Sequence, residues 1–466
     1  MKKISAYTLI IVAMLLAMFV ITQSFAQEIS MNPRSVGMAN TAVSYARGVE
    51  AIGVNPAAIG LPGLKRASIS IFPIAMFAGT DFFDMATYNK YFTGVDDGSG
   101  KRTGYYLNAA DKAAILSTFG DDLGRFSTSF GYRIIGGTVS SGIGEFGFNI
   151  SDRISANLTV PRDYADFLLN GNTPGKTFSF DKTDIKSWWV RDYSASYAHQ
   201  LYLPLVKYIS AGVSVKLIQG FGYFGTESFN SYFTTDPDSF VISGRANMVA
   251  RYAGTEFLVH MTKTPGAFDL FASPVGSGLG FDVGMYAEIN SVLSVGMSIT
   301  DIGSMTWKRN AKEIVADENI YLNDFSNGDQ LDELQSKLSG TEQRISSFET
   351  ALPTTLHLGA SMKLPRLLGE DDRFMIAGSY TQGFNNEPST TTAARIGIGA
   401  EWIPVPAFPL RAGVTLGGYT PIAFAAGVGL NIGDKFMFDV STDNLSVLLT
   451  QNASAASFAF GMHFEF

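Results

Sequence analysis

The last nine residues of the chain, 458–466, alternate strictly between two kinds of side chain. The even positions hold Phe458, Phe460, Met462, Phe464 and Phe466, and the odd positions hold Ala459, Gly461, His463 and Glu465. Because successive side chains of a strand point to opposite faces, this pattern predicts a strand with one apolar face and one small or polar face. A soluble strand has the same alternation. The aromatic character of the apolar face favours a strand that faces lipid.

This ending resembles the final strand of outer-membrane barrels, which their assembly machinery recognises by its terminal aromatic residue. We therefore expect barrel-assembly machinery and outer-membrane lipid among the partners of the chain. The expected barrel-assembly signal comprises Phe458, Phe460, Met462, Phe464 and Phe466.

The first 26 residues have the pattern of a cleaved signal peptide. Lys2 and Lys3 precede an apolar run over residues 6–21, and Ser24-Phe25-Ala26 supplies small residues before Gln27. The alternative is a transmembrane anchor, but a run of 16 residues is short of the roughly 20 that a helix needs. The chain has no Cys, which excludes lipid attachment through an N-terminal Cys. We expect export to the outer membrane of a Gram-negative bacterium.

Beyond residue 26 no apolar run is long enough for a transmembrane helix. A membrane protein without such helices has to be a closed barrel, since lipid cannot satisfy an open sheet edge. The remaining alternative is a large soluble all-β protein. The formal net charge of −8 argues against a nucleic-acid partner, whose phosphates call for a basic surface.

Segments of roughly ten residues with strand character recur over residues 65–466, as barrel strands require. The candidates are 66–76, 124–135, 145–154, 187–198, 209–220, 241–252, 280–289, 292–302, 354–364, 374–383, 394–403, 410–418, 422–432, 435–442 and 458–466. Closed bacterial barrels have even strand counts. We therefore predict an all-β fold, a transmembrane antiparallel barrel of 14 strands, with 66–76 or a weak neighbour as the miscounted segment.

Three stretches, 104–119, 161–171 and 328–351, have helical character and are expected as extracellular helical loops. A lumenal or periplasmic position is the alternative for any one of them. In the second loop, Phe167, Leu168 and Leu169 either form a capture surface for an apolar ligand or pack against the barrel rim.

Several strands carry Gly on one face, such as Gly397 with Gly399 and Gly427 with Gly429. These glycines either leave room inside the barrel for a plug or substrate, or relieve the curvature of the sheet.

Residues 27–64 are rich in small residues and contain two Asn-Pro pairs, at Asn32-Pro33 and Asn55-Pro56, which favour turns. Composition alone allows a plug inside a barrel or a periplasmic tail. The pattern Arg34-Ser35-x-Gly37-Met38-Ala39-x-Thr41 followed by Asn55-Pro56-Ala57 resembles the hatch segment of the FadL-like superfamily. That resemblance implies a 14-stranded barrel with an N-terminal hatch in its lumen, and a hatch motif of Arg34, Gly37, Asn55, Pro56 and Ala57.

A narrower resemblance joins three further patterns to a FadL-related group of unknown function. These are Asp301-Ile302-Gly303 followed by Trp307, the loop 161–172 ending in Gly171-Asn172, and Leu352-Pro353-Thr354. The superfamily includes fatty-acid and hydrocarbon channels as well as PorV-like barrels that assist secretion. The resemblance therefore implies a channel for uptake of hydrophobic small molecules such as fatty acids, with a non-transporting or secretion-associated scaffold as the alternative.

The sequence predicts no catalytic, cofactor or metal site. None of the four His residues, His199, His260, His357 and His463, has a second His or Cys at metal-ligand spacing, and no hydrolase or nucleotide motif is present. We expect that the protein is not an enzyme, although strand order leaves a Ser-His-Asn triad with His463 as base open. Otherwise His463 faces the lumen and contacts the hatch. Arg34 either pairs with a lumenal carboxylate such as Glu465 or faces water.

Overall fold

The computed structural model of the chain describes residues 30–60, 66–96, 98–204, 206–254, 273–324, 326–364, 373–418, 421–433, 435–450 and 452–466. The expected signal peptide lies outside the described residues, as do the first and last residues of the expected hatch range. The N-terminal segment here means residues 30–60. Among the described residues, no helix has the length and apolar character needed to cross a membrane.

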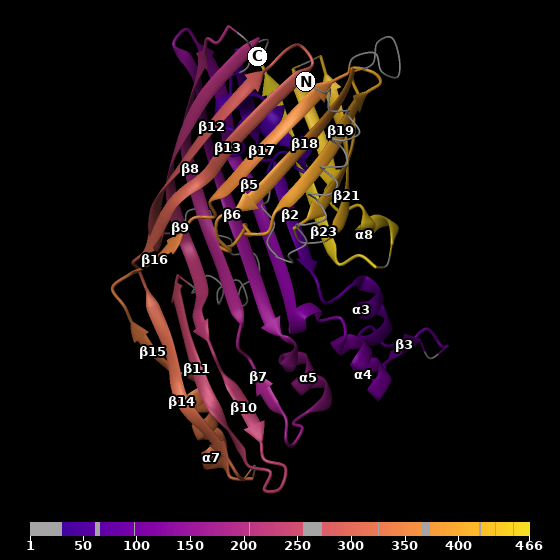
Figure 1. Cartoon of the computed structure of the whole chain (residues 1–466), viewed down its shortest axis with the longest axis vertical. Coiled ribbons are helices and arrows are strands. Elements are labelled where there is room, and N and C mark those ends of the chain that lie inside the picture. Colours follow the sequence, from indigo (N-terminus) through magenta and orange to yellow (C-terminus); the bar gives the residue numbers. More distant parts are fainter. Residues whose placement is uncertain are drawn as a thin grey trace, which may run out of the picture.

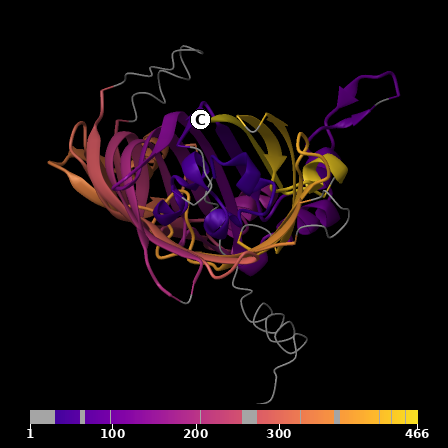
Figure 2. The ribbon, with the colours of Figure 1, turned by 90° about the horizontal axis from the view of Figure 1, so that it is seen from above.

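Fourteen antiparallel strands form a closed barrel, which confirms the predicted fold class (Figures 1 and 2). One of them is interrupted and consists of β1 (Ala67–Ile71) and β2 (Ile74–Thr80). The others are β5 (Leu123–Ser141), β6 (Gly144–Pro161), β8 (Asp184–Leu201), β9 (Tyr208–Phe229), β12 (Gly276–Glu288), β13 (Leu293–Trp307), β17 (Thr355–Lys363), β18 (Arg373–Gly383), β19 (Arg395–Ile403), β20 (Leu410–Gly417), β21 (Ile422–Ile432), β22 (Phe436–Thr442) and β23 (Ala455–Glu465). The barrel closes where β23 pairs with β1 and β2.

The miscounted strand is not the one we expected. Residues 66–76 belong to the barrel wall, because β1 and β2 pair with both β23 and β5. Their signal in the sequence is weak because Phe72, at φ 52°, and Pro73 interrupt the strand. The surplus candidate is 241–252, which forms β11 (Ile242–Ala253) and pairs with the far end of β9 and with β14 (Lys312–Leu322). The alternation of apolar and polar residues identifies a strand, but it does not show whether that strand belongs to the barrel wall.

The two ends of the barrel differ in their connections. Short turns such as 142–143 and 404–409 lie at the end where the C-terminus is labelled, and long connections lie at the other end (Figure 1). The long connections hold the helices α3 (Met85–Tyr91), α4 (Ala109–Leu116), α5 (Arg162–Asn170), α7 (Gly328–Ser339) and α8 (Ser446–Leu449) and the strands β3 (Val95–Asp96), β4 (Arg102–Thr103), β7 (Thr177–Ser179), β10 (Tyr232–Thr235), β15 (Thr341–Arg344) and β16 (Phe348–Ala351). We call these two ends the turn end and the loop end.

The expected helical loops contain α4, α5 and α7. The third expectation is wrong beyond Ser339, since 341–351 forms β15 and β16, which pair with β14 and β13. Together β10, β11, β14, β15 and α7 project past the loop end as a sheet that we call the extension (Figure 1). Helix α3 was not expected from the sequence.

The wall is apolar outside and polar inside. On β12, the outward Phe281 and Val283 are 46% and 41% exposed, whereas Asp282 between them is 1% exposed. Many other large apolar side chains of the strands are exposed in the same way, including those of Val215, Leu217, Ile398, Phe424, Val428 and Phe458. This is the reverse of a soluble protein and is the arrangement of a wall that meets lipid.

The N-terminal segment lies inside the barrel (Figure 2). Its four short helices are α2 (Pro33–Val36), η1 (Ala42–Ser44), η2 (Gly48–Ala51) and η3 (Pro56–Ala58). They contact different parts of the wall: α2 lies against β21–β23, η1 against β13 and β17, η2 against β1 and β5, and η3 against β9 and β12. The segment therefore crosses the whole lumen.

Candidate functional site

Both Asn-Pro pairs begin short helices of the segment, as their chemistry suggests. Asn32 Oδ1 accepts from the Ser35 backbone N–H at 3.2 Å, and Asn55 Oδ1 accepts from the Ala57 N–H at 3.1 Å. In each case Pro occupies the first helical position, where no hydrogen-bond donor is needed. The sequence predicted turns at these two pairs, and in the structure each turn is the capped start of a short helix.

Glycines of the wall let the segment approach backbone to backbone. A Cβ atom added at Gly399 would lie 2.4 Å from the Met38 carbonyl oxygen, and one added at Gly296 would lie 2.1 Å from that of Val43. The backbone of the segment also comes close at Gly212, Gly397, Gly413 and Gly427, whereas side chains of the segment come close at Gly284, Gly359 and Gly461.

Of the two roles considered for the strand glycines, room for a plug is therefore correct for Gly397, Gly399 and Gly427. It is wrong for Gly429, whose added Cβ would meet Asp439 Oδ1 at 2.3 Å instead of the segment.

The residues of the expected hatch motif lie on opposite sides of the lumen. Gly37 packs against Gly427 of β21 and Ser441 of β22. Asn55 is fully buried, and its Nδ2 donates to the carbonyls of Val43 and Met285, each at 3.1 Å. Ala57 accepts from Ser210 Oγ of β9 at 2.7 Å. Pro56 lies against Gly212 of the same strand. The motif therefore fixes both ends of the segment rather than forming one compact site.

Arg34 holds the segment to the wall through an ion-pair network. Its Nε and Nη2 donate to Glu401 at 2.9 and 2.7 Å, and its Nη1 lies 3.1 Å from Glu50. Arg411 of β20 also donates to Glu401, at 2.7 Å, and pairs with Asp439 of β22. Of the two alternatives for Arg34, pairing with a lumenal carboxylate is confirmed, although that carboxylate is Glu401 and not the suggested Glu465. The alternative that Arg34 faces water is wrong, since its side chain is only 23% exposed. Alternation shows which carboxylates face the lumen but not which of them meets Arg34.

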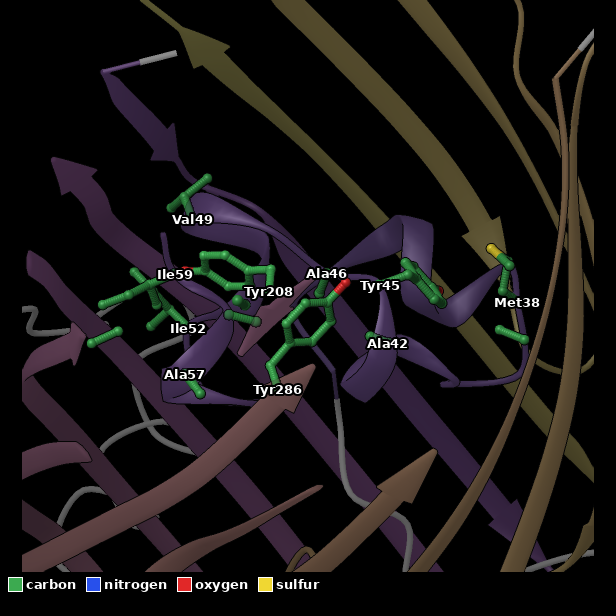
Figure 3. Close-up of a cluster of buried hydrophobic side chains, with 14 of the residues drawn as sticks. Met38, Ala42, Tyr45, Ala46, Val49, Ile52, Ala57, Ile59, Tyr208 and Tyr286 are labelled. Atoms are coloured by element: carbon green, nitrogen blue, oxygen red, sulfur yellow. The ribbon is translucent and has the colours of Figure 1, made fainter. Parts of the chain in front are cut away.

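The segment also has an apolar core of its own with the turn-end half of the wall (Figure 3). Tyr208 and Tyr286 cover small side chains of the segment, and the Tyr208 hydroxyl donates to the Gly60 carbonyl at 2.7 Å. The labelled members from the segment are Met38, Ala42, Tyr45, Ala46, Val49, Ile52, Ala57 and Ile59. The lumen is therefore packed at this level.

Two adjoining cavities lie between the segment and the loop end. The outer one encloses about 580 Å³ and the inner one about 1080 Å³, each including space open to solvent. They share Thr381 and Arg395 in their linings, so they lie next to each other. The outer cavity is rich in hydroxyl groups, from Thr355, Thr390, Thr391 and Thr415. The inner cavity ends on Asn40 and Val54 of the segment.

A cluster of five buried charged side chains lines part of the inner cavity, and only Asp301 among them was singled out from the sequence. Arg153 contacts Asp192 and Asp301, each at 2.8 Å, and Lys216 contacts Asp282 at 2.7 Å and Asp301 at 2.8 Å. They come from β6, β8, β9, β12 and β13. Their only signal in the sequence is a charge at an inward position of a strand that otherwise carries Ser or Gly there.

Two patterns of the narrower resemblance meet at this cluster. Asp301 has φ 55° and Gly303 has φ 152°, which marks an irregularity in β13. Thr354 Oγ1 donates to the Asp301 carbonyl at 2.8 Å, and the Leu352 N–H donates to the Gly303 carbonyl at 3.0 Å. The third pattern lies elsewhere, since Asn172 Oδ1 accepts from Thr235 Oγ1 of β10 at 2.7 Å.

Trp307 packs in a buried aromatic group at the loop-side ends of β8, β9 and β13. Its neighbours there are Trp188, Tyr223 and Phe348, and its Nε1 donates to Thr350 Oγ1 at 3.0 Å. At the loop-end level, the side of the barrel formed by β8, β9 and β13 is therefore filled with side chains. The side formed by β17–β23 holds the outer cavity at this level.

Four of the five expected barrel-assembly residues lie on β23, and Phe466 directly follows its last residue. Phe458 and Phe466 are exposed, while Ala459 and Gly461 are buried. His463 faces the lumen, close to Glu50 and Asp439.

Among solved structures, the chain resembles the toluene transporter TbuX of Ralstonia pickettii at 14% identity, with 93% of this chain and 98% of that chain covered and a TM-score of 0.47. It also resembles the toluene transporter TodX of Pseudomonas putida at 10% identity, with 95% and 98% covered and a TM-score of 0.40. A Pseudomonas aeruginosa FadL homologue matches at 11% identity, with 95% and 99% covered and a TM-score of 0.25.

The last of these three structures bears the name of the superfamily that the N-terminal motif resembles. No curated protein matches the sequence. A family described as "Family of unknown function (DUF5723)" matches residues 62–443, which is well over half of the chain. The chain therefore belongs to the family of unknown function DUF5723.

Proposed function

We propose that the protein is a gated channel of the outer membrane, through which a small molecule enters from the loop end. The observation that carries the proposal is the pair of adjoining cavities on the loop-end side of the N-terminal segment. In this proposal the two cavities form the path of the solute, and the segment closes it. An apolar outer wall and a polar passage suit a protein that carries a solute across lipid. In this proposal the N-terminal segment is the hatch, and release of the solute requires its movement.

Short turns on one side and long loops on the other are the usual orientation of outer-membrane barrels, with the loops outside the cell. We accordingly place the loop end and its helices on the extracellular side. The signal peptide and the aromatic final strand would serve export and barrel assembly.

We infer that the cargo combines an apolar part with a polar group. The resemblance implies hydrophobic molecules such as fatty acids. The passage itself is lined by Thr hydroxyls, Arg395 and Asp443, and then by the charged cluster around Asp301. A bare hydrocarbon would gain no hydrogen bond from such a lining, whereas a molecule with a polar end would replace water there.

The apolar part of such a cargo could first meet α5. Leu168 is 81% exposed, and this makes it the candidate for a capture surface. Phe167 instead packs edge-on against Phe178 and Phe233, at centroid distances of 5.5 and 5.4 Å. In this proposal Leu168 serves capture, while Phe167 packs against the loop-end strands β7 and β10.

A disulfide lock tests the gate directly. A Cβ added at Gly37 would lie 3.3 Å from Cβ of Ser441, close to the roughly 3.5–4.5 Å of natural disulfides. The chain has no Cys of its own, so Gly37→Cys with Ser441→Cys introduces the only pair. We expect that liposomes carrying the oxidised protein take up medium-chain fatty acids no faster than empty liposomes. Reduction should restore uptake.

The two single Cys variants are the matched controls and should transport in both redox states. Equal uptake by the locked and the reduced protein would contradict the proposal that the segment gates the passage.

The extension favours a second candidate function, a scaffold for envelope or secretion proteins. It projects past the rim and exposes Phe240, Tyr321 and Leu338. If this is the function, removal of residues 231–241 and 323–340 should abolish recovery of stoichiometric envelope proteins in a pull-down. Uptake by the reconstituted protein would then be absent with or without the extension.

A further inference from the structure

One His and two carboxylates meet where the N-terminal segment touches the last two strands. They are Glu50 of η2, Asp439 of β22 and His463 of β23. One potential ligand atom from each residue lies within 4.8 Å of those of the other two. No two of them are neighbours in the sequence, so the fold alone brings them together.

The two barrel residues are held rigidly. Asp439 pairs with Gly461 in the register of β22 and β23, and His463 lies two residues further along β23 on the same inner face. The third residue, Glu50, comes from the segment. The Glu50 side chain is 11% exposed and that of Asp439 is 7% exposed, so water competes little for these carboxylates.

Two arginines lie beside the three residues, and each of them contacts only one oxygen of a carboxylate in the group. Arg34 makes two hydrogen bonds to Glu401 and contacts only Oε2 of Glu50. Arg411 likewise bonds Glu401 and contacts only Oδ1 of Asp439. Among the described residues, each of the two carboxylates thus has one oxygen that accepts no hydrogen bond from these arginines.

A third guanidinium lies near and does not take up these atoms. Arg133 lines the same small cavity as the trio, and it donates to the carbonyls of Val49 and Ile52 and to Asn149 Oδ1. Its bonds are with neutral groups, so it adds positive charge without occupying a carboxylate.

We propose that Glu50, Asp439 and His463 bind a divalent first-row transition metal ion, for which Zn²⁺ is the probe. One imidazole nitrogen and two carboxylate oxygens are a donor set that such ions accept, with a water molecule in the remaining position. Ca²⁺ and Mg²⁺ prefer oxygen ligands only, and the imidazole selects against them. Because one ligand comes from the segment and two from the wall, the ion pins the segment beside the seam where the barrel closes.

The test uses the full mature protein without a polyhistidine tag, purified in detergent and stripped with a chelator. Equilibrium dialysis against Zn²⁺, followed by elemental analysis, should find one ion per chain. His463→Gln and Glu50→Gln should each weaken binding at least about tenfold, since even loss of an outer-shell partner costs about 10–100-fold. The matched control is His199→Gln, because His199 stacks on Tyr197 and lies far from the trio along β8. It should bind like the parent protein.

A second readout separates loss of binding from loss of folding. Zn²⁺ should raise the midpoint of thermal unfolding in the parent protein and in His199→Gln, but not in His463→Gln. Heat-modifiable migration on gels checks that each variant forms a barrel. The proposal is overturned if the parent protein binds Zn²⁺ no more tightly than folded His463→Gln, or if Zn²⁺ shifts the midpoint of both equally. It concerns attachment of the segment and stands or falls separately from uptake.

Discussion

The turn-end and loop-end halves of the lumen differ in the side chains that the wall turns inward. Around the N-terminal segment the wall presents Gly at many positions, so that the segment packs closely against it. Towards the loop end the wall presents Thr, Ser and charged side chains around two adjoining cavities. A close-packed half resists motion, because interiors at this density do not deform gradually. The difference suggests that the segment moves as a unit or not at all.

The largest expected effect comes from filling one of the glycine contacts. Gly399→Phe would place a ring where Met38 now lies, since even a Cβ there comes within 2.4 Å of its carbonyl oxygen. We expect the segment to be displaced and the barrel to conduct ions permanently in planar bilayers. Gly378→Phe is the matched control, because an added Cβ there meets nothing closer than 3.8 Å. Low conductance of folded Gly399→Phe would show that the wall yields instead.

Removing Arg34 should have the next largest effect. Arg34→Met leaves Glu401 and Glu50 without their shared partner, which should destabilise the seating of the segment by about 3 kcal/mol. The measurement is protease cleavage within the segment of the intact barrel. Glu401 keeps Arg411 as a partner, so Glu50 is the carboxylate that loses its described ion pair. The double variant Arg34→Met with Glu50→Gln removes this unpaired charge and should recover part of the loss. If both variants are as resistant as the parent protein, the network does not hold the segment.

Narrowing the proposed passage should slow uptake of the solute without changing how firmly the N-terminal segment is held. Thr391→Trp fills part of the outer cavity, and we expect slower uptake with unchanged protease resistance of residues 30–60. Thr392→Trp is a neighbour whose side chain is exposed and does not line the cavity. Equal uptake by both variants would mean that the solute takes another route.

The smallest effect is expected on the surface of α5. Leu168→Ser changes an exposed side chain, so unfolding should shift by less than about 0.5 kcal/mol. If Leu168 captures cargo, uptake should fall at low ligand concentration and recover at high concentration. A uniform loss at all concentrations would instead indicate damage to the rim.

The sequence by itself determined the features that repeat or act over a few residues. The two-residue period of β23 decided which side chains face lipid and which face the lumen, because a strand allows no other arrangement. Asn32 and Asn55 determined the starts of two short helices, because an Asn cap bonds to backbone only two or three residues away.

Only the tertiary structure decided the contacts between distant residues. Alternation could not show that Arg34 meets Glu401, that β11 leaves the ring, or that the charges of five strands converge at Asp301. Each of these depends on strand register and on closure of the barrel, which bring together residues hundreds of positions apart. The trio of Glu50, Asp439 and His463 exists for the same reason: the chain closes a ring and returns its N-terminal segment into it.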